Sequence, residues 1–400
     1  MSRVETTTNF RDSNGADLGK KLITKDYLIS VYPSIGEQIG IPPELWVWGQ
    51  GTFGQLGNND TTERRTPVTT SAGGTNWKQV SAGRDHTAAI KTDGTLWTWG
   101  RGGQGQLGDN TATDKSTPVT TFAGGTNWKQ VSSGGYHTAA IKTDGTLWTW
   151  GAGNYGQLGG NQYINQSTPV TTFAGGTNWK QVSGGRLHSA AIKTDGTLWT
   201  WGKGTYGRLG DNTVTDKSTP VTTFAGGINW KQVSSGWFHT AAIKTDGTLW
   251  TWGRGGSGQL GTNDTTDRPT PVTTFAGGTN WKQVSGGTGH CAAIKTDGTL
   301  WTWGLGTNGR LGNNTTTNKS TPVTTFAGGT NWKQVGGGGY YCAAIKTDGT
   351  LWTWGYGHEG RLGTNNTTEK RTPVTTFAGG TNWKQVSAGT FTGAIKSVDF

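Results

Sequence analysis

One fifteen-residue segment of alternating apolar and polar positions recurs along almost the whole chain. The copy at His137–Gly151 reads HTAAIKTDGTLWTWG, and near-copies follow at a constant step of 51 residues. Their last tryptophans are Trp48, Trp99, Trp150, Trp201, Trp252, Trp303 and Trp354. A period of this length indicates a repeat architecture, in which each unit buries its apolar surface against its neighbours.

Within the segment, Asp144-Gly145 separates two apolar stretches and predicts a β-hairpin. A type I′ turn needs positive φ at both central residues, which favours Asp-Gly. A two-residue loop here puts two cross-strand pairs on one face of the hairpin. These pairs are Ile141 with Trp148 and Ala139 with Trp150, and the other face receives Thr138, Ala140, Leu147 and Thr149. Neither face is polar, so we expect both to be covered.

Each repeat is long enough for four short strands. In one unit we expect strands at Trp128–Ser132, His137–Thr143, Thr146–Trp150 and around Thr168–Phe173. Pro169 at the start of the fourth strand suits a sheet edge, because proline cannot donate to a strand ladder. Four antiparallel strands repeated at this spacing are typical of a propeller blade.

The two ends of the repeat region complete one another. It begins with only the third and fourth strands, at Leu45–Trp48 and Thr66–Thr70, and finishes with only the first and second, at Trp383–Ser387 and Gly393–Lys396. The sequence therefore predicts an all-β fold: a seven-bladed β-propeller of four-stranded antiparallel blades over residues 45–400. Pairing of the N- and C-terminal strands in one blade closes the ring and removes open sheet edges.

Two motifs carry a resemblance to a known family. The pattern WGxGxxGQLG at Trp99–Gly108 and the pattern xGxxHT at Ser133–Thr138 resemble the regulator of chromosome condensation repeat. The resemblance covers all seven units and implies a seven-bladed propeller. It implies less about function, because the fold hosts exchange factors, light sensors, inhibitors and adaptors.

Composition supports a packed scaffold. Only 30% of residues are hydrophobic and 70 are glycine, but 22 are tryptophan, whose large rings can replace missing aliphatic side chains. Twenty-one of these tryptophans occupy repeated positions, and only Trp237 is additional. Plant ultraviolet-B photoreceptors of this fold cluster tryptophans at the position of Trp237. The equivalents here are Arg84, Gly135, Arg186, Thr288 and Gly339, so light sensing is not expected.

The net charge of +11 follows mainly from the repeat. Each unit carries two lysines, such as Lys129 and Lys142, and most carry an aspartate such as Asp144. Fourteen lysines and six aspartates of this kind leave +8. We expect them to form a ring on one end of the propeller, where solvation is a simpler explanation than binding. Basicity from one repeated motif is weak evidence for nucleic acid, which we do not expect as a partner.

Cys291 and Cys342 are the only cysteines and occupy equivalent positions in adjacent units, at or beyond disulfide reach. We expect both to be free thiols. No secretory signal and no apolar run of membrane-spanning length is visible, so synthesis in the cytoplasm without membrane insertion is expected.

Residues 1–44 lie outside the repeat and form an N-terminal arm. Thr24 is a candidate helix cap and Pro33 a stop. The arm residues expected to dock are Tyr27, Leu28, Val31 and Tyr32. Asp17–Pro33 weakly resembles leading segments of bacteriophage virion proteins, which implies anchoring of the arm in a larger assembly such as a phage virion.

The copies disagree at one end of the propeller. At the other end, the uniform face, the loops almost always read TDG and FAGGTN. Loops that vary among otherwise matching copies are suited to recognition, and Tyr, Trp, Phe and Arg are common binding anchors. The candidates on this variable face between first and second strands are Arg84, Asp85, Tyr136, Arg186, Leu187, Trp237, Phe238, Tyr340 and Phe391. Those between third and fourth strands are Phe53, Arg101, Tyr155, Tyr206, Arg254, Tyr356 and His358.

No pattern in the chain indicates catalysis or a cofactor. Five second strands begin with a histidine, but Tyr341 and Phe391 replace it in two units, so a packed ring bonded to a loop carbonyl is a better interpretation than a metal ligand. The histidines are His86, His137, His188, His239 and His290. No nucleophile–base pair or phosphate loop is recognisable, and GxGxxG matches such as Gly151–Gly156 precede no helix.

These observations favour a non-enzymatic recognition or structural propeller. We expect it to be held in an assembly by residues 1–44 and to bind a protein or a glycan receptor through the variable face. A cytoplasmic adaptor or inhibitor is the main alternative. A carbohydrate-active enzyme and a guanine nucleotide exchange factor are weaker ones, the second because exchange factors of the family insert a wedge between strands and no insertion interrupts the 51-residue step.

Overall fold

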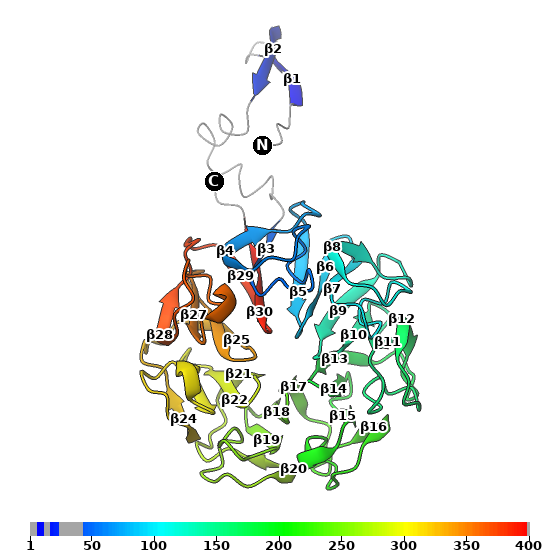
Figure 1. Ribbon diagram of the computed structural model, residues 1–400, viewed down its shortest axis with the longest axis vertical. Helices are drawn as coiled ribbons and strands as arrows, with labels where there is room; N and C mark the ends of the chain where they lie inside the picture. The colour runs from blue at the N-terminus through cyan, green and yellow to red at the C-terminus, as the bar shows by residue number, and fades with distance from the viewer. Residues whose placement is uncertain (1–5, 12–16, 24–42, 398–400) are drawn as a thin grey trace.

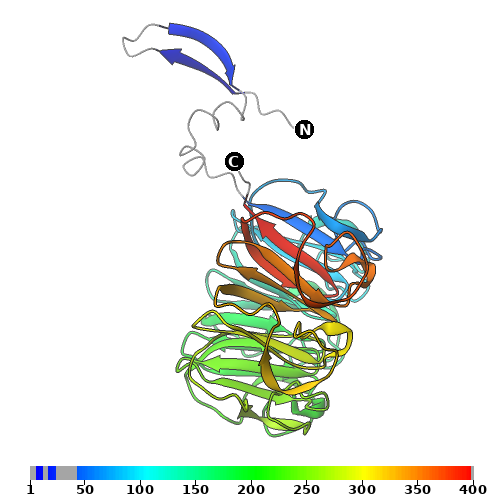
Figure 2. The same ribbon diagram turned by 90° about the vertical axis from the view of Figure 1, so that its left-hand side faces the viewer.

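The computed structural model describes residues 6–11, 17–23 and 43–397. Residues 43–397 form seven four-stranded antiparallel sheets arranged radially around an axis (Figure 1). Seen from the side, the ring is a thick disc (Figure 2). The predicted seven-bladed propeller is confirmed.

The strands of each blade run in chain order from the axis to the rim. In six blades they are β5 (Trp77–Ala82), β6 (His86–Lys91), β7 (Leu96–Gly100), β8 (Lys115–Thr120); β9 (Trp128–Ser133), β10 (His137–Lys142), β11 (Leu147–Gly151), β12 (Gln166–Thr171); β13 (Trp179–Gly184), β14 (His188–Lys193), β15 (Leu198–Gly202), β16 (Lys217–Thr222); β17 (Trp230–Ser235), β18 (His239–Lys244), β19 (Leu249–Gly253), β20 (Arg268–Thr273); β21 (Trp281–Gly286), β22 (His290–Lys295), β23 (Leu300–Gly304), β24 (Lys319–Thr324); β25 (Trp332–Gly337), β26 (Tyr341–Lys346), β27 (Leu351–Gly355) and β28 (Lys370–Thr375).

The seventh blade joins the two ends of the ring. Its order is β29 (Trp383–Ala388), β30 (Phe391–Lys396), β3 (Glu44–Gly49) and β4 (Arg64–Thr69). β3 pairs with β30 over six residue pairs, from Glu44 opposite Lys396 to Gly49 opposite Phe391. The predicted closure by strand pairing is confirmed.

The central hairpin of each blade has a different register from the predicted one. Ala140 lies opposite Trp148 and Thr138 opposite Trp150, so each tryptophan faces a residue one position away from its predicted partner. The loop has three residues: Gly145 N donates to Lys142 O, Lys142 N donates to Thr146 O, and Gly145 alone has positive φ, at 81°. This is a type I turn followed by a left-handed glycine. The type I′ prediction was wrong. The one-residue shift places Ala139 and Ile141 on the face opposite to the two tryptophans.

The core lies between adjacent sheets rather than within one. Ala88, Ile90 and Leu96 of one blade pack against the next blade's apolar face, which consists of Trp128, Val131, Ala140 and Trp150. The rings of Trp128 and Trp150 meet edge to face with centroids 6.1 Å apart. The opposite face of the same blade, with Ala139, Ile141 and Leu147, continues the pattern into the following blade.

A polar ladder also links the innermost strands. Gln79 Nε2 donates to Val131 O at 2.9 Å, and its Oε1 accepts from Val131 N at 3.0 Å. Equivalent glutamine pairs connect every neighbouring blade, including Gln385 with Val80 across the closure. Each carboxamide thus satisfies backbone groups of the next blade that no strand pairs.

The sequence predicted a ring of solvated lysines, but half of the repeated lysines lie over tryptophan rings instead. Lys142 Nζ lies 4.8 Å from the centroid of Trp128 and 4.6 Å from that of Trp148, a cation–π arrangement. The same contact recurs for Lys91, Lys193, Lys244, Lys295, Lys346 and Lys396. Lysines of the other kind, such as Lys129, are exposed.

The N-terminal arm contains a hairpin that the sequence did not predict, formed by β1 (Thr6–Arg11) and β2 (Asp17–Ile23). The predicted helix and the docking residues Tyr27, Leu28, Val31 and Tyr32 lie outside the described residues. Among the described residues, no helix has the length and hydropathy needed to cross a membrane.

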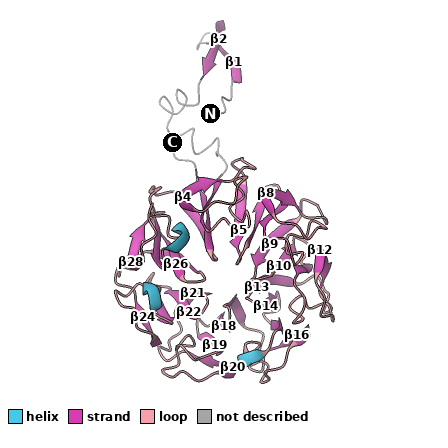
Figure 3. Ribbon diagram, in the orientation of Figure 1, coloured by secondary structure: helices cyan, strands magenta, loops and turns pink. Residues whose placement is uncertain are grey.

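Three 3₁₀ helices interrupt the loops between third and fourth strands (Figure 3). They are η1 (Thr205–Gly207), η2 (Thr307–Gly309) and η3 (His358–Gly360). Each precedes an arginine that stands where other blades have glutamine.

Candidate recognition face

The variable face is built on a collar of glycines around the axis. Loops between first and second strands bond across blades through their backbones: Gly135 N donates to Gly185 O at 2.9 Å, and Gly339 N donates to Gly389 O at 2.7 Å. A Cβ on Gly134 would lie 2.6 Å from Gly185 O, so a side chain there would force neighbouring blades apart. The collar therefore holds the residues that follow it at fixed positions over the axis.

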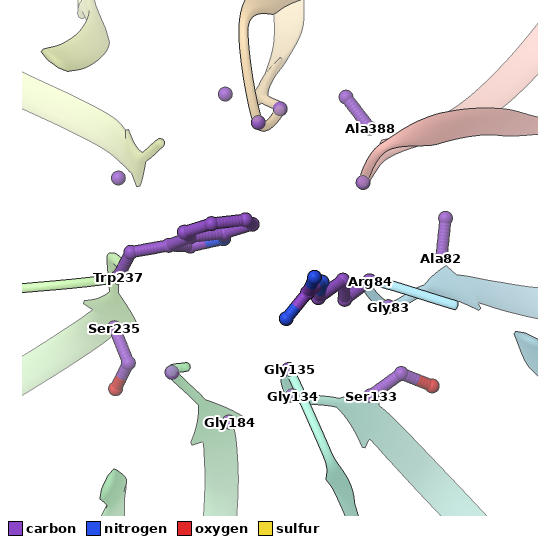
Figure 4. A pocket seen from close by; sticks show the side chains of 16 residues that line it. Ala82, Gly83, Arg84, Ser133, Gly134, Gly135, Gly184, Ser235, Trp237 and Ala388 are labelled. Carbon is purple, nitrogen blue, oxygen red and sulfur yellow. The ribbon is translucent and has the colours of Figure 1, made fainter. Parts of the chain in front are cut away.

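Trp237 and Arg84 reach toward one another over a narrow axial cavity of about 70 Å³ (Figure 4). Glycine, alanine and serine line the cavity elsewhere. The Trp237 ring also has Arg186 5.1 Å from its centroid and meets Tyr340 edge to face at 6.4 Å. Trp237 is thus the central side chain of the face.

A wider basin of about 420 Å³ opens beside Trp237. Its charged lining consists of four arginines, Arg84, Arg101, Arg186 and Arg361, and two carboxylates, Asp85 and Glu359. Asp85 Oδ2 lies 3.2 Å from Arg101 Nη1 and 3.5 Å from Arg84 Nε, and Glu359 pairs with Arg361. Phe53, Trp237 and Tyr340 supply the aromatic part of the wall.

A second pocket of about 290 Å³ adjoins the basin and shares Arg101 and Arg186 with it. Tyr136, Tyr155 and Leu187 supply its apolar surface. The two pockets form one depression that runs outward from the axis.

The remaining predicted residues, except Phe391, form two aromatic clusters beside Trp237. Tyr206 meets Phe238 edge to face at 6.3 Å, and Arg254 lies 5.2 Å from the Tyr206 centroid. Tyr340 meets Tyr356 at 6.1 Å, and Tyr356 stacks on His358 at 5.5 Å. The structure therefore brings residues from different blades into one surface of alternating rings and guanidinium groups.

Phe391 does not belong to this surface. It is fully buried at the start of β30, where five other blades have histidine and one has tyrosine. The preceding loop is one residue shorter in this blade, so Thr390 alone reaches the basin. Its assignment to the variable face was wrong.

Three arginines beneath the face escaped the sequence prediction: Arg208, Arg310 and Arg361. Their side chains are almost fully buried, and the exposed fractions of the residues are 1%, 2% and 3%. Arg310 and Arg361 flank the Tyr340 ring at 5.4 and 5.6 Å from its centroid. Burial lowers the pKa of Arg208 to about 10. The sequence signal that could have revealed them is the motif GRLG, which replaces GQLG in these three blades.

The five repeated histidines are packed, as predicted, but their partner was predicted wrongly. His86 Nε2 lies 2.9 Å from Thr138 Oγ1 of the next blade rather than bonding a loop carbonyl. His239 and His290 meet Cys291 and Cys342 in the same way. Both thiols are free and buried, as expected, and burial raises their pKa. Residues 6–11, 17–23 and 43–397 contain no cluster of three or more potential metal ligands.

Family models match the whole ring. A model of the RCC1-like domain matches residues 43–280, and models of the regulator of chromosome condensation repeat match residues 281–310, 297–345 and 348–395. The chain belongs to the regulator of chromosome condensation family.

Individual relatives agree with this assignment. Ultraviolet-B receptor UVR8 of Arabidopsis thaliana is 34% identical over 82% of this chain and 76% of its own length. The Regulator of chromosome condensation of Xenopus laevis is 28% identical over 90% and 89%. The crystal structure of yeast RCC1 (Prp20) bound to Kap60 has a TM-score of 0.78, 19% identity and 90% coverage of both chains, and it supports the fold. Membership of this family indicates a protein-interaction or regulatory role.

Proposed function

We propose that this member of the regulator of chromosome condensation family is a non-enzymatic recognition module that binds a protein partner through the variable face. The observation that carries the proposal is the convergence of Arg84, Arg186, Trp237 and Tyr340, from four different blades, on one basin. The repeats agree at most other positions and differ in the loops that supply these side chains, as expected if these loops serve recognition rather than the scaffold. Aromatic and arginine side chains around a depression are the usual centres of protein interfaces.

No relative named above is described as a virion protein. Anchoring of residues 1–44 in a phage particle therefore stays a prediction from the sequence, as does a glycan ligand. A cytoplasmic adaptor or inhibitor would use the same face and is covered by the same test.

The test compares the two ends of the ring. A photo-crosslinking phenylalanine analogue is placed either at Tyr340, which is 37% exposed, or at Phe224 on the uniform face, which is 67% exposed. The proposal expects partner adducts in extracts of the source organism from position 340 and none from position 224. Adducts from position 224 alone would place the interface on the uniform face and refute the proposal.

Substitution gives an independent measure. Changing Trp237, Phe238, Tyr340 and Tyr356 to Ala should abolish the binding of the partner that crosslinking identifies, measured by pull-down without a crosslinker. The matched control changes exposed phenylalanines of the uniform face, namely Phe122, Phe224 and Phe326. Unchanged capture by the first variant, with both variants folded, would contradict the proposal.

A further inference from the structure

The basin beside Trp237 carries more positive than negative charge. Its four arginines face two carboxylates, and both carboxylates are engaged with Arg84, Arg101 and Arg361. Among the described residues, no carboxylate lies within ion-pair distance of Arg186. Its guanidinium instead lies over Trp237 and Phe238, at 5.1 and 5.5 Å. Arg186 is therefore available to an external anion.

Several buried donors of the face also lack partners. Arg186 Nε, Arg310 Nη1 and Arg361 Nη1 are buried and make no hydrogen bond among the described residues. A buried N–H without a partner destabilises the fold, and more so on a charged group. Arg186 and Arg361 both line the basin, so two of its guanidinium groups are not fully satisfied by the protein.

The shape of the depression favours an extended ligand. The basin of about 420 Å³ and the pocket of about 290 Å³ meet at Arg101 and Arg186, so a chain can cross these two side chains and enter both spaces. The outer pocket offers Tyr136, Tyr155 and Leu187, which suit an apolar or aromatic group. An isolated phosphate ion would leave this outer pocket empty.

The chemistry of the wall favours a peptide over a nucleic acid. The rings beside the basin already pack against arginines, as Tyr136 does against Arg84 at 5.0 Å and Phe53 against Arg101 at 4.8 Å. Base stacking needs free ring faces. A peptide carboxylate needs no free ring face, because it binds an arginine guanidinium through two parallel hydrogen bonds.

We infer that the variable face binds an extended acidic peptide segment of its partner. A carboxylate binds Arg186 and Arg101, and a neighbouring apolar or aromatic side chain enters the pocket of Tyr136, Tyr155 and Leu187. The inference rests on the proposed function, because it names the kind of partner surface that the variable face takes.

The probe for this inference is a fluorescein-labelled random copolymer of glutamate and tyrosine, with polyglutamate and oligothymidylate as comparisons. Fluorescence anisotropy at fixed ionic strength should show that the full chain binds the copolymer more tightly than either comparison. Arg186→Gln should weaken copolymer binding about tenfold, since a charge-assisted hydrogen bond is lost. Tyr155→Ala should reduce the affinity for the copolymer to that for polyglutamate.

The matched control is Lys180→Gln, which removes one positive charge from β13 of the same blade at an exposed position away from the basin. It should leave binding unchanged. Arg186→Lys, which keeps the charge but not the planar fork, should fall between the wild type and Arg186→Gln. Circular dichroism of each variant shows whether it remains folded.

Three outcomes would overturn the inference. Equal losses in Arg186→Gln and Lys180→Gln would mean attraction by net charge alone. Tighter binding of oligothymidylate, lost in Arg186→Gln, would mean a nucleic acid ligand. Absence of copolymer binding, while crosslinking at position 340 still traps a partner, would refute the acidic segment and leave the proposed function standing. Failure of the crosslinking itself would refute the proposed function.

Discussion

At the scale of single residues, the exchange of glutamine for arginine sets the shape of the loops that carry the face. Gln157 Oε1 accepts a hydrogen bond from Tyr155 N at 2.9 Å. A guanidinium cannot accept, so Arg310 Nε instead donates to Thr307 O at 2.9 Å. The intervening Asn308 then has a φ of +61°. Tyr206 and Glu359 show the same left-handed conformation before Arg208 and Arg361.

Arg310→Gln should therefore increase the free energy of unfolding. The change removes a buried guanidinium whose Nη1 has no partner and restores the acceptor that other blades use. We expect a gain of about 1 kcal/mol, measured by urea denaturation. Arg208→Gln is the control, because Arg208 Nη1 donates to the backbone oxygen of Trp237 at 3.0 Å and its loss should cancel any gain. Arg310 Nη2 instead donates to the side chains of Thr307, which is exposed, and Asn308, which is partly exposed, so water can replace these bonds. Equal destabilisation by both changes would contradict the explanation.

The repeated histidines are a second residue-scale feature. Thr138 Oγ1 donates to Gln106 O at 2.9 Å, so it must accept from His86 Nε2. This assigns the neutral tautomer protonated on Nε2 and leaves Nδ1 as an acceptor without a partner. Burial lowers the pKa of His86 to about 3 and the pKa of His137 and His239 to about 4. All three stay neutral in the folded ring.

The protein should lose stability as the pH falls below about 6.5, the ordinary histidine pKa. Below this pH the unfolded chain binds protons that the folded ring does not, so unfolding becomes more favourable until the folded pKa is reached. For His137, with a folded pKa of about 4, the loss at pH 5 is about 2 kcal/mol. Urea midpoints at pH 7 and pH 5 measure it.

The control for this pH effect is His137→Phe, since phenylalanine already fills the equivalent position at Phe391. The variant should show a smaller difference between the two midpoints than the wild type. An unchanged difference would assign the pH dependence to other groups.

At the scale of elements, the strands were predictable and their register was not. Tryptophan, β-branched residues and Asp-Gly turns mark the strands of a blade, and their period marks the blade itself. Register depends on loop length, and Asp-Gly also fits the three-residue loop that closes at Lys142 and Thr146. The carboxylate of Asp144 then accepts from Thr146 N and Oγ1, which stabilises the longer turn. A sequence pattern does not separate the two turns.

Gly145→Ala tests how tightly this turn is held between blades. Gly145 has a φ of +81°, and a Cβ there would collide with Thr177 O in the loop leading to the next blade. We expect a loss of about 3 kcal/mol in the free energy of unfolding, from strain and the collision together. Gly124 has a φ of +52° and open space around its Cβ position. Gly124→Ala should lose only about 1 kcal/mol. Equal losses would show that the contact between blades adds nothing.

At the scale of the whole molecule, the closed ring brings residues that differ between the repeats together on one surface. The candidate residues were readable from the aligned copies, and all of them except Phe391 lie on the variable face. Their grouping around Trp237 was not readable, because it depends on the ring bringing Arg84, Arg186 and Tyr340 from separate blades to one axis. The buried Arg208, Arg310 and Arg361 were missed because a single exchange within a conserved loop motif looks like drift.

Closure of the ring through one shared blade leads to a prediction about circular permutation. Ile395 lies opposite Leu45, as Ile141 lies opposite Leu147, so a Thr-Asp-Gly-Thr linker can join Lys396 to Leu45 as in other blades. New termini between Asp246 and Gly247 would again close the ring by strand pairing, now between β18 and β19. New termini between Gly227 and Ile228 would leave two whole blades joined only by contacts between sheets, namely side-chain packing and the glutamine ladder.

We expect the first permutant to unfold at the urea concentration of the wild type and the second at a lower one. In the first, the backbone hydrogen bonds of β18 and β19 hold the chain ends together, so the ring opens only when a blade unfolds. In the second, side-chain packing and the hydrogen bonds of the glutamine ladder are the links between the two end blades, and these can separate before any blade is lost. Both permutants share the linker, so the comparison isolates the position of the opening. Equal midpoints would show that contacts between blades, not pairing within one, hold the ring closed.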